Sequence, residues 1–200
     1  MYEFLRQDQL EPIEITTQLD GTVQVTSTNT ARTIEQGLFT CFLDDCFHRA
    51  RFISFKTATW FGCTDHSAQD DLQPFLVKQL HTSRWFGYNM ARCPIPEQRL
   101  FTVNIYRATA EAKAVLLMHF SEIFLNTAKS DGTLDLTQTL EDLCFFTDNE
   151  LFVGTVSHAS VLLVYPPDQS FADALPTYGK WSYYNDNSMQ IKLADFLIFE

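Results

Sequence analysis

The apolar residues of this chain change their spacing several times along the sequence, and these changes constrain the fold more than any other feature. Residues 11–28 place apolar side chains at every second position, which leaves one apolar and one polar face. Residues 31–50 place apolar side chains four apart, as Ile34 and Leu38 are, and this is the spacing of one helix face. Residues 51–56 return to alternation. The chain is therefore expected to mix strands with helices.

The same pattern extends to the C-terminus. The predicted strands span residues 12–17, 22–26, 51–56, 99–106, 151–156 and 160–165, with a last strand over 189–193 and 196–199. The predicted helices span residues 31–50, 67–80, 110–128, 137–146 and 168–175. Asp20-Gly21 is a two-residue turn signal between the first two strands. Thr109 and Asp168 are placed to cap helices, and residues 83–98 are expected to form a loop around an aromatic cluster.

Hairpin-like strand pairs with interspersed helices favour an α+β fold, in which helices pack on one face of a mainly antiparallel sheet. No repeat, low-complexity tract or Gly/Ser linker interrupts the chain, so residues 1–200 are expected to form a single domain.

The 18 Phe run from Phe4 to Phe199. Full burial of one Phe contributes about 1.5–3 kcal/mol, so most of them are expected in the core.

The charge of the chain is unevenly distributed along the sequence. The net charge is -11, and the formal charges sum to -5 over residues 1–50, +3 over residues 51–130 and -9 over residues 131–200. A segregated negative field attracts basic partners and repels nucleic acid and anionic membranes. The sequence therefore predicts a basic protein partner, no nucleic acid and no membrane.

The cysteines and the N-terminus indicate the compartment. Five Cys are an odd number in a chain long enough to fold without disulfides. Residues 1–6 lack a basic stretch followed by an apolar one, and no apolar run approaches the roughly 18–20 residues that cross a bilayer. We expect a reduced, cytoplasmic protein with mostly buried thiols.

Cys41, Cys46, Cys63 and His66 are the best candidates for a tetrahedral zinc site. The spacing of the first pair opposes it, because helical positions five apart point about 140° away from each other. Two buried thiols and an unrelated loop cysteine explain the same residues. No metal and no cofactor are therefore predicted.

Cys63, with Asp65 and His66 close in sequence, is also the candidate for a nucleophilic thiol. An enzyme of an unrecognised family, with its site here and in the aromatic loop 84–92, is therefore one alternative. The chain has no Gly-rich phosphate loop and no Gly-x-Ser-x-Gly elbow. No catalytic residue is predicted.

Two segments are candidates for binding a partner. Residues 131–150 contain no Lys or Arg and could hold the basic side chains of another protein, although solubility explains the same composition. The acidic residues of this stretch are Asp131, Asp135, Glu141, Asp142, Asp148 and Glu150. Tyr183, Tyr184 and Asp186 form the second candidate, because Tyr is common at binding hot spots. Trp85 and Phe86 are expected to fill the core instead.

The sequence favours a non-catalytic acidic protein that neutralises a basic protein partner. A small acidic α+β domain without recognisable chemistry resembles bacterial immunity proteins, which block a nuclease or other toxin by binding it. This resemblance extends over the whole chain in general character and includes no motif, and it implies a toxin domain as the partner. A structural or assembly component is a further alternative, which predicts a large apolar self-interface.

Overall fold

The computed structural model describes residues 1–4, 14–17, 23–26, 34, 36–58, 63–89, 101–125, 127–128, 134–135 and 137–196. Their main feature is an eight-stranded sheet with the order β14-β1-β13-β12-β11-β4-β8-β5. Every neighbouring pair in it is antiparallel. The strands are β1 (Tyr2–Phe4), β4 (Phe52–Thr57), β5 (Leu76–Thr82), β8 (Phe101–Arg107), β11 (Leu140–Phe146), β12 (Leu151–Val156), β13 (Val161–Val164) and β14 (Trp181–Tyr183).

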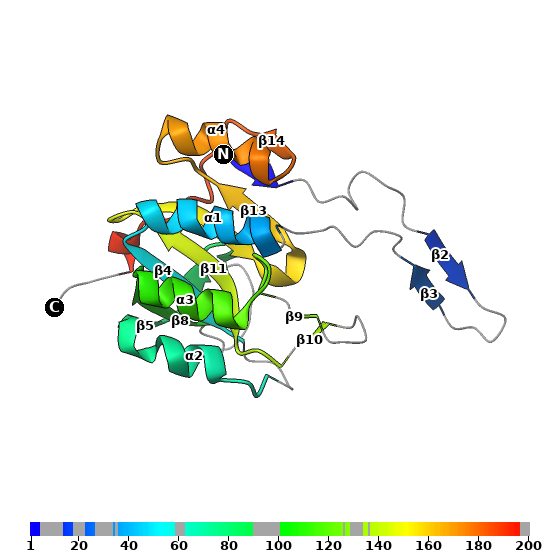
Figure 1. Cartoon of the computed structure of the whole chain (residues 1–200), viewed down its shortest axis with the longest axis horizontal. Helices are drawn as coiled ribbons and strands as arrows, with labels where there is room; N and C mark the ends of the chain where they lie inside the picture. The colour runs from blue at the N-terminus through cyan, green and yellow to red at the C-terminus, as the bar shows by residue number, and fades with distance from the viewer. Residues whose placement is uncertain are drawn as a thin grey trace.

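Helices cover one face of this sheet, as Figure 1 shows, in the order α4, α1, α3, α2. Their bounds are α1 Gln36–Arg49, α2 Ser67–Leu72, α3 Ala110–His119 and α4 Gln169–Tyr178. The predicted α+β class, with helices on one face of an antiparallel sheet, is confirmed. None of the described helices is long and apolar enough to span a membrane.

The sheet separates two apolar cores. The first lies under the helices, where Phe42 of α1 and Leu116 of α3 pack with Ile53 and Phe55 of β4. Strand alternation directs every second residue to the opposite face, and a second core forms there. Its strand residues include Val103, Ile105 and Cys144, and its cover comes from Trp85, Phe86, Ile191 and Leu193. Trp85 and Phe86 are buried, as predicted.

Three small two-stranded sheets accompany the large one. They pair β2 (Glu14–Thr17) with β3 (Val23–Thr26), β6 (Arg84–Trp85) with β7 (Tyr88–Asn89), and β9 (Thr127–Ala128) with β10 (Leu134–Asp135). The first is the predicted N-terminal hairpin. Its register pairs Thr17 with Val23. The predicted turn at Asp20-Gly21 lies outside the described part of the chain.

The predicted caps at Thr109 and Asp168 are confirmed, whereas α2 begins after His66 and has no side-chain cap at Ser67. The Thr109 side chain accepts a hydrogen bond from the backbone N–H of Ala112 at the start of α3. The Asp168 side chain accepts one from Phe171 at the start of α4. Each bond satisfies a backbone donor that the first helical turn leaves without an intrahelical partner.

The predicted helix over residues 67–80 is wrong beyond its first turns. Helix α2 ends at Leu72, a 3-10 turn spans Gln73–Phe75, and β5 follows. Pro74 lacks the N–H that a continuing helix needs, and its ring would clash with the carbonyl four residues earlier. Strand β5 instead pairs with β8 from Leu76 to Thr82, with a β-bulge between Leu76 and Lys78.

The predicted acidic helix over residues 137–146 is also wrong, because this segment is the buried strand β11. Leu143 and Phe145 face the helices, while Cys144 and Phe146 face the second core. A strand covered on both faces has a continuous apolar run instead of an alternating one. The run Leu143–Phe146 is continuously apolar and so indicates a strand that is covered on both faces.

Two further predicted elements differ from the structure. Helix α3 ends at His119 and not near residue 128, since Phe120 is already extended, with φ -128° and ψ 143°. Residues 189–193 do not form a strand; they place Ile191 and Leu193 against the second core and lead into the 3-10 turn Leu193–Asp195. Core packing holds this segment together with two backbone hydrogen bonds, from Leu151 N–H to the Ile191 carbonyl and from Leu193 N–H to the Asn149 carbonyl. Residues 197–199 lie outside the described part.

Candidate functional site

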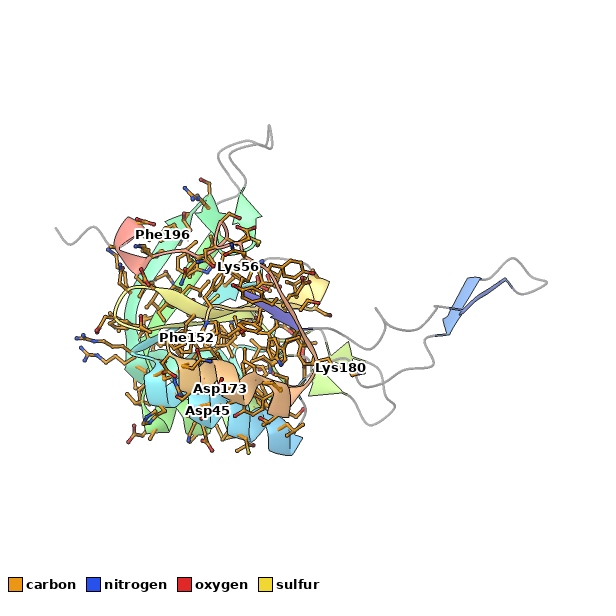
Figure 2. The ribbon with its side chains drawn as sticks, turned by 90° about the horizontal axis from the view of Figure 1, so that it is seen from above. Asp45, Lys56, Phe152, Asp173, Lys180 and Phe196 are labelled. Carbon is orange, nitrogen blue, oxygen red and sulfur yellow. The ribbon has the colours of Figure 1, made fainter. Side chains whose placement is uncertain are left out.

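Two of the acidic residues predicted to bind a partner, Glu141 and Asp142, contact Lys56 inside the molecule. The Nζ atom of Lys56 lies 2.9 Å from Oε1 of Glu141 and 2.9 Å from Oδ2 of Asp142. Asp142 is fully buried, and Lys56 is only 6% exposed. Figure 2 places the labelled Lys56 within the body of the molecule. Asp142 therefore contributes no exposed surface to a partner.

A β-bulge in β11 brings Asp142 to this position. Glu141 pairs with Lys56 and Cys144 with Ser54, so Asp142 and Leu143 together oppose one residue of β4. Asp142 has a left-handed backbone, with φ 59°, which Asp adopts more readily than most residues.

Reciprocal hydrogen bonds hold the bulge to the 3-10 turn Ser157–Ala159, which follows β12. The backbone N–H of Ser157 donates to Oδ1 of Asp142 at 2.7 Å, and the backbone N–H of Asp142 donates to Oγ of Ser157 at 3.0 Å. A buried ammonium or carboxylate is stable only when it is paired and hydrogen-bonded. The contacts among Lys56, Glu141, Asp142 and Ser157 meet that requirement without a ligand, so the cluster stabilises the bulge.

The other acidic residues of the stretch lie elsewhere. Asp148 and Glu150 occupy the exposed turn after β11, at the end of this strand opposite Asp142, where they form ion pairs with Arg51 and Lys192. Asp135 belongs to β10. Asp131 lies outside the described residues. The tertiary structure therefore divides residues 131–150 between a buried cluster and an exposed turn.

The predicted aromatic site lies at the β14 edge of the sheet, with β1, β13 and β12 between it and β11. Tyr183 is 63% exposed and Tyr184 is 44% exposed. Asp186 accepts hydrogen bonds from the backbone and the hydroxyl of Ser188, and these bonds hold the pKa of the Asp186 carboxyl below its usual range. These three residues share one edge, but the fold separates them from Glu141 and Asp142.

The surroundings of Cys63 shift the pKa of its thiol. Burial raises this pKa, and the negative charge of Glu141 raises it further. The Asp65 carboxylate accepts hydrogen bonds from Ser67 and Gln138. Within the described part of the chain, no group of three His, Cys, Asp or Glu side chains is close enough to hold a metal ion.

An acidic surface that the sequence analysis missed lies on the helical layer. The four helices and the Asp168 cap carry seven carboxylates and only two cationic side chains, Arg49 and Lys113. The carboxylates belong to Asp44, Asp45, Asp70, Asp71, Glu111, Asp168 and Asp173. In Figure 2 the labelled Asp45 and Asp173 lie on the helical side of the sheet, and Phe196 lies on the other side. We call this surface the acidic helical face.

Four of the seven carboxylates join neighbouring helices. The pairs are Asp44 with Lys113, Asp71 with His119 at 2.8 Å, Asp168 with Arg49 at 2.7 Å, and Asp45 with the Tyr178 hydroxyl at 2.6 Å. Asp70, Glu111 and Asp173 take no part in these contacts between helices and are exposed. They are the acidic side chains of this face that a partner can reach most easily.

Two apolar side chains are exposed among these charges. Leu38 on α1 is 49% exposed, and Met118 on α3 is 64% exposed. The acidic helical face therefore offers negative charge together with apolar contact area. These charges are spread over four helices that are distant in sequence, so no local motif indicated them.

No family model matches the chain, and neither a curated protein nor a solved structure matches it.

Proposed function

We propose that this protein binds a basic protein partner through the acidic helical face. The observation that carries the proposal is the charge imbalance of that face, with seven carboxylates against two cationic side chains. Such a field accelerates the encounter with a positively charged surface and suppresses encounters with acidic ones. Neutralisation of a basic toxin domain, which the sequence analysis favoured, is the form of this function that we propose.

The exposed apolar residues of the face support the same function. Charge on its own mainly raises the association rate, whereas affinity comes from a central patch that loses its contact with water. Leu38 and Met118 supply such contact area between the carboxylates.

The test starts with affinity capture from the source cells, followed by purification of the captured protein and reconstitution of the complex. The decisive variant is Asp70→Asn/Glu111→Gln/Asp173→Asn, which removes three charges without breaking the pairs that join the helices. The matched control, Asp148→Asn/Glu150→Gln/Asp195→Asn, removes three charges from other surfaces.

We expect a one-to-one complex with a basic protein whose association rate falls as salt rises. The variant of the helical face should lower the association rate about tenfold, whereas the control should change it by less than about twofold. Equal effects of the two variants would show that only the overall charge matters. A captured partner without a basic surface would contradict the proposal directly.

A further inference from the structure

A hollow at one end of the large sheet gathers cationic side chains in this acidic chain. Its volume is about 780 Å³. Arg49, Arg51, Lys78 and Arg107 line it, which is four of the nine Lys and Arg among the described residues. Among the described residues, Asp148 is the one carboxylate that lines the hollow. The lining therefore carries a net positive charge, although the chain as a whole carries -11.

The strand register builds this concentration of charge. Phe52, at the start of β4, pairs with Arg107 at the end of β8, and Lys78 of β5 pairs with Ile105 of β8. Helix α1 ends at Arg49, just before β4 begins. Each cationic residue thus lies at or near the end of an element, at the same end of the sheet.

Arg49 and Arg51 have carboxylate partners at the rim of the hollow. The Nε atom of Arg49 donates to Asp168 at 2.7 Å, and Arg51 pairs with Asp148. Arg107 is exposed in the hollow. Arg49 also donates to the Asp45 carbonyl and the Ser170 hydroxyl, so it mainly contributes charge to the hollow. The Arg51 guanidinium is held at the rim by its bond to Asp148 and carries further N–H donors, because a guanidinium has five.

The remaining wall of the hollow consists of Thr109, Thr147 and an apolar surface. Ala50, Phe52, Val77 and Ala108 contribute to it, and Val77 is 42% exposed. The guanidinium carbon of Arg51 lies 5.6 Å from the centre of the Phe52 ring. The hollow therefore combines a flat apolar surface with several cationic donors, and its size is within the usual range for small-molecule sites.

We propose that this hollow binds a small organic phosphate, with the phosphate held by the Arg and Lys side chains and an apolar group held against Phe52 and Val77. A phosphate dianion suits several convergent cations better than a single carboxylate does, and guanidinium groups bind phosphate through paired hydrogen bonds. This site lies at one end of the sheet and adjoins the acidic helical face, because Arg49 lines the hollow and pairs with Asp168 of that face. Asp70, Glu111 and Asp173, the carboxylates that the protein-binding test removes, do not line the hollow.

The experiment titrates the full chain with 1-naphthyl phosphate and, separately, with inorganic phosphate, and follows the heat of binding. The variant Lys78→Gln/Arg107→Gln removes two cations of the hollow. The control Arg84→Gln/Lys180→Gln removes two exposed cations elsewhere. Thermal unfolding shows that each protein is folded, and Arg107→Gln serves as the test if the double variant is not.

We expect saturable binding of 1-naphthyl phosphate that is tighter than binding of inorganic phosphate. Loss of two charged hydrogen-bond donors should weaken it about tenfold or more, and the control should change it by less than about twofold. Absence of saturable binding, or equal weakening by both double variants, would overturn the phosphate site. Equal affinity for the two ligands would overturn the role of the apolar wall.

Discussion

Lys56 occupies a position on β4 where the alternation of the strand directs its side chain into the protein. Its ammonium group is stable there because Glu141 and Asp142 approach it from the neighbouring strand. The sequence pattern placed Lys56 correctly on a strand. It gave no sign of the pairing, because adjacent carboxylates most often belong to a solvated surface. The contact depends on a bulge in a strand far along the chain.

Replacement of this lysine should therefore be costly. In Lys56→Met, two carboxylates remain close together in the interior without their cation, and we expect the free energy of unfolding to fall by about 3–5 kcal/mol. Urea denaturation at neutral pH measures this loss.

A second variant separates charge from packing. Lys56→Met/Glu141→Gln/Asp142→Asn removes the carboxylates as well, and Asn tolerates the left-handed backbone at position 142. We expect this triple variant to be more stable than Lys56→Met. A triple variant that is less stable than the single one would mean that the ion pairs are not the reason for the cost.

At the scale of elements, the β6–β7 hairpin covers the second face of the sheet. The Trp85 ring lies 6.0 Å from Phe146 and 4.9 Å from Phe196, measured between ring centres. Phe86 lies directly on β12 at Gly154, where an added Cβ would be 2.5 Å from a ring carbon. Glycine at this position therefore permits the hairpin to approach the sheet.

We expect Gly154→Ala to lower the free energy of unfolding by about 1–3 kcal/mol, because the Phe86 ring must shift within a packed core. Gly37→Ala is the matched control, since nothing lies within 4 Å of its added Cβ, and it should leave stability unchanged or slightly higher. Chemical denaturation of both variants makes the comparison. A Gly154→Ala protein as stable as the natural one would contradict this packing of the hairpin.

At the scale of the whole molecule, the described residues place one buried thiol on each face of the sheet. Cys46 lies in the core under the helices, and Cys144 lies in the second core. Burial raises the pKa of both thiols, which leaves little thiolate to react at neutral pH. Cys41 is exposed on α1.

These thiols can test whether the two cores unfold together. We expect Cys41 to react with a thiol reagent in the native protein, and Cys46 and Cys144 to react only when the whole chain unfolds. Labelling over a urea series, resolved by mass spectrometry, should then give both buried thiols the same free energy of opening. Reaction of Cys144 well before Cys46 would indicate that the second face opens separately, against the expectation of a single domain.

Helix caps, hairpin strands and a helix could be predicted from the sequence, because they depend on residues that are close together along the chain. The caps at Thr109 and Asp168, the strand pair Leu151–Val156 and Val161–Val164, and the helix Gln36–Arg49 all follow from local periodicity and local hydrogen bonds. These signals were also sufficient for the α+β class. The overall acidity that suggests a basic partner is likewise a property of composition.

The burial of the strands and the exposure of the carboxylates depend on tertiary contacts between segments that are distant in sequence. Leu76–Thr82 and Leu140–Phe146 are strands because partner strands supply their backbone hydrogen bonds. In addition, the two cores cover both faces of Leu140–Phe146. Asp142 became buried because Lys56 neutralises it. The acidic helical face and the cationic hollow likewise join residues that are far apart in sequence. Charge and burial at these sites depend on neighbours in space, and those neighbours are set by the packing of the whole chain.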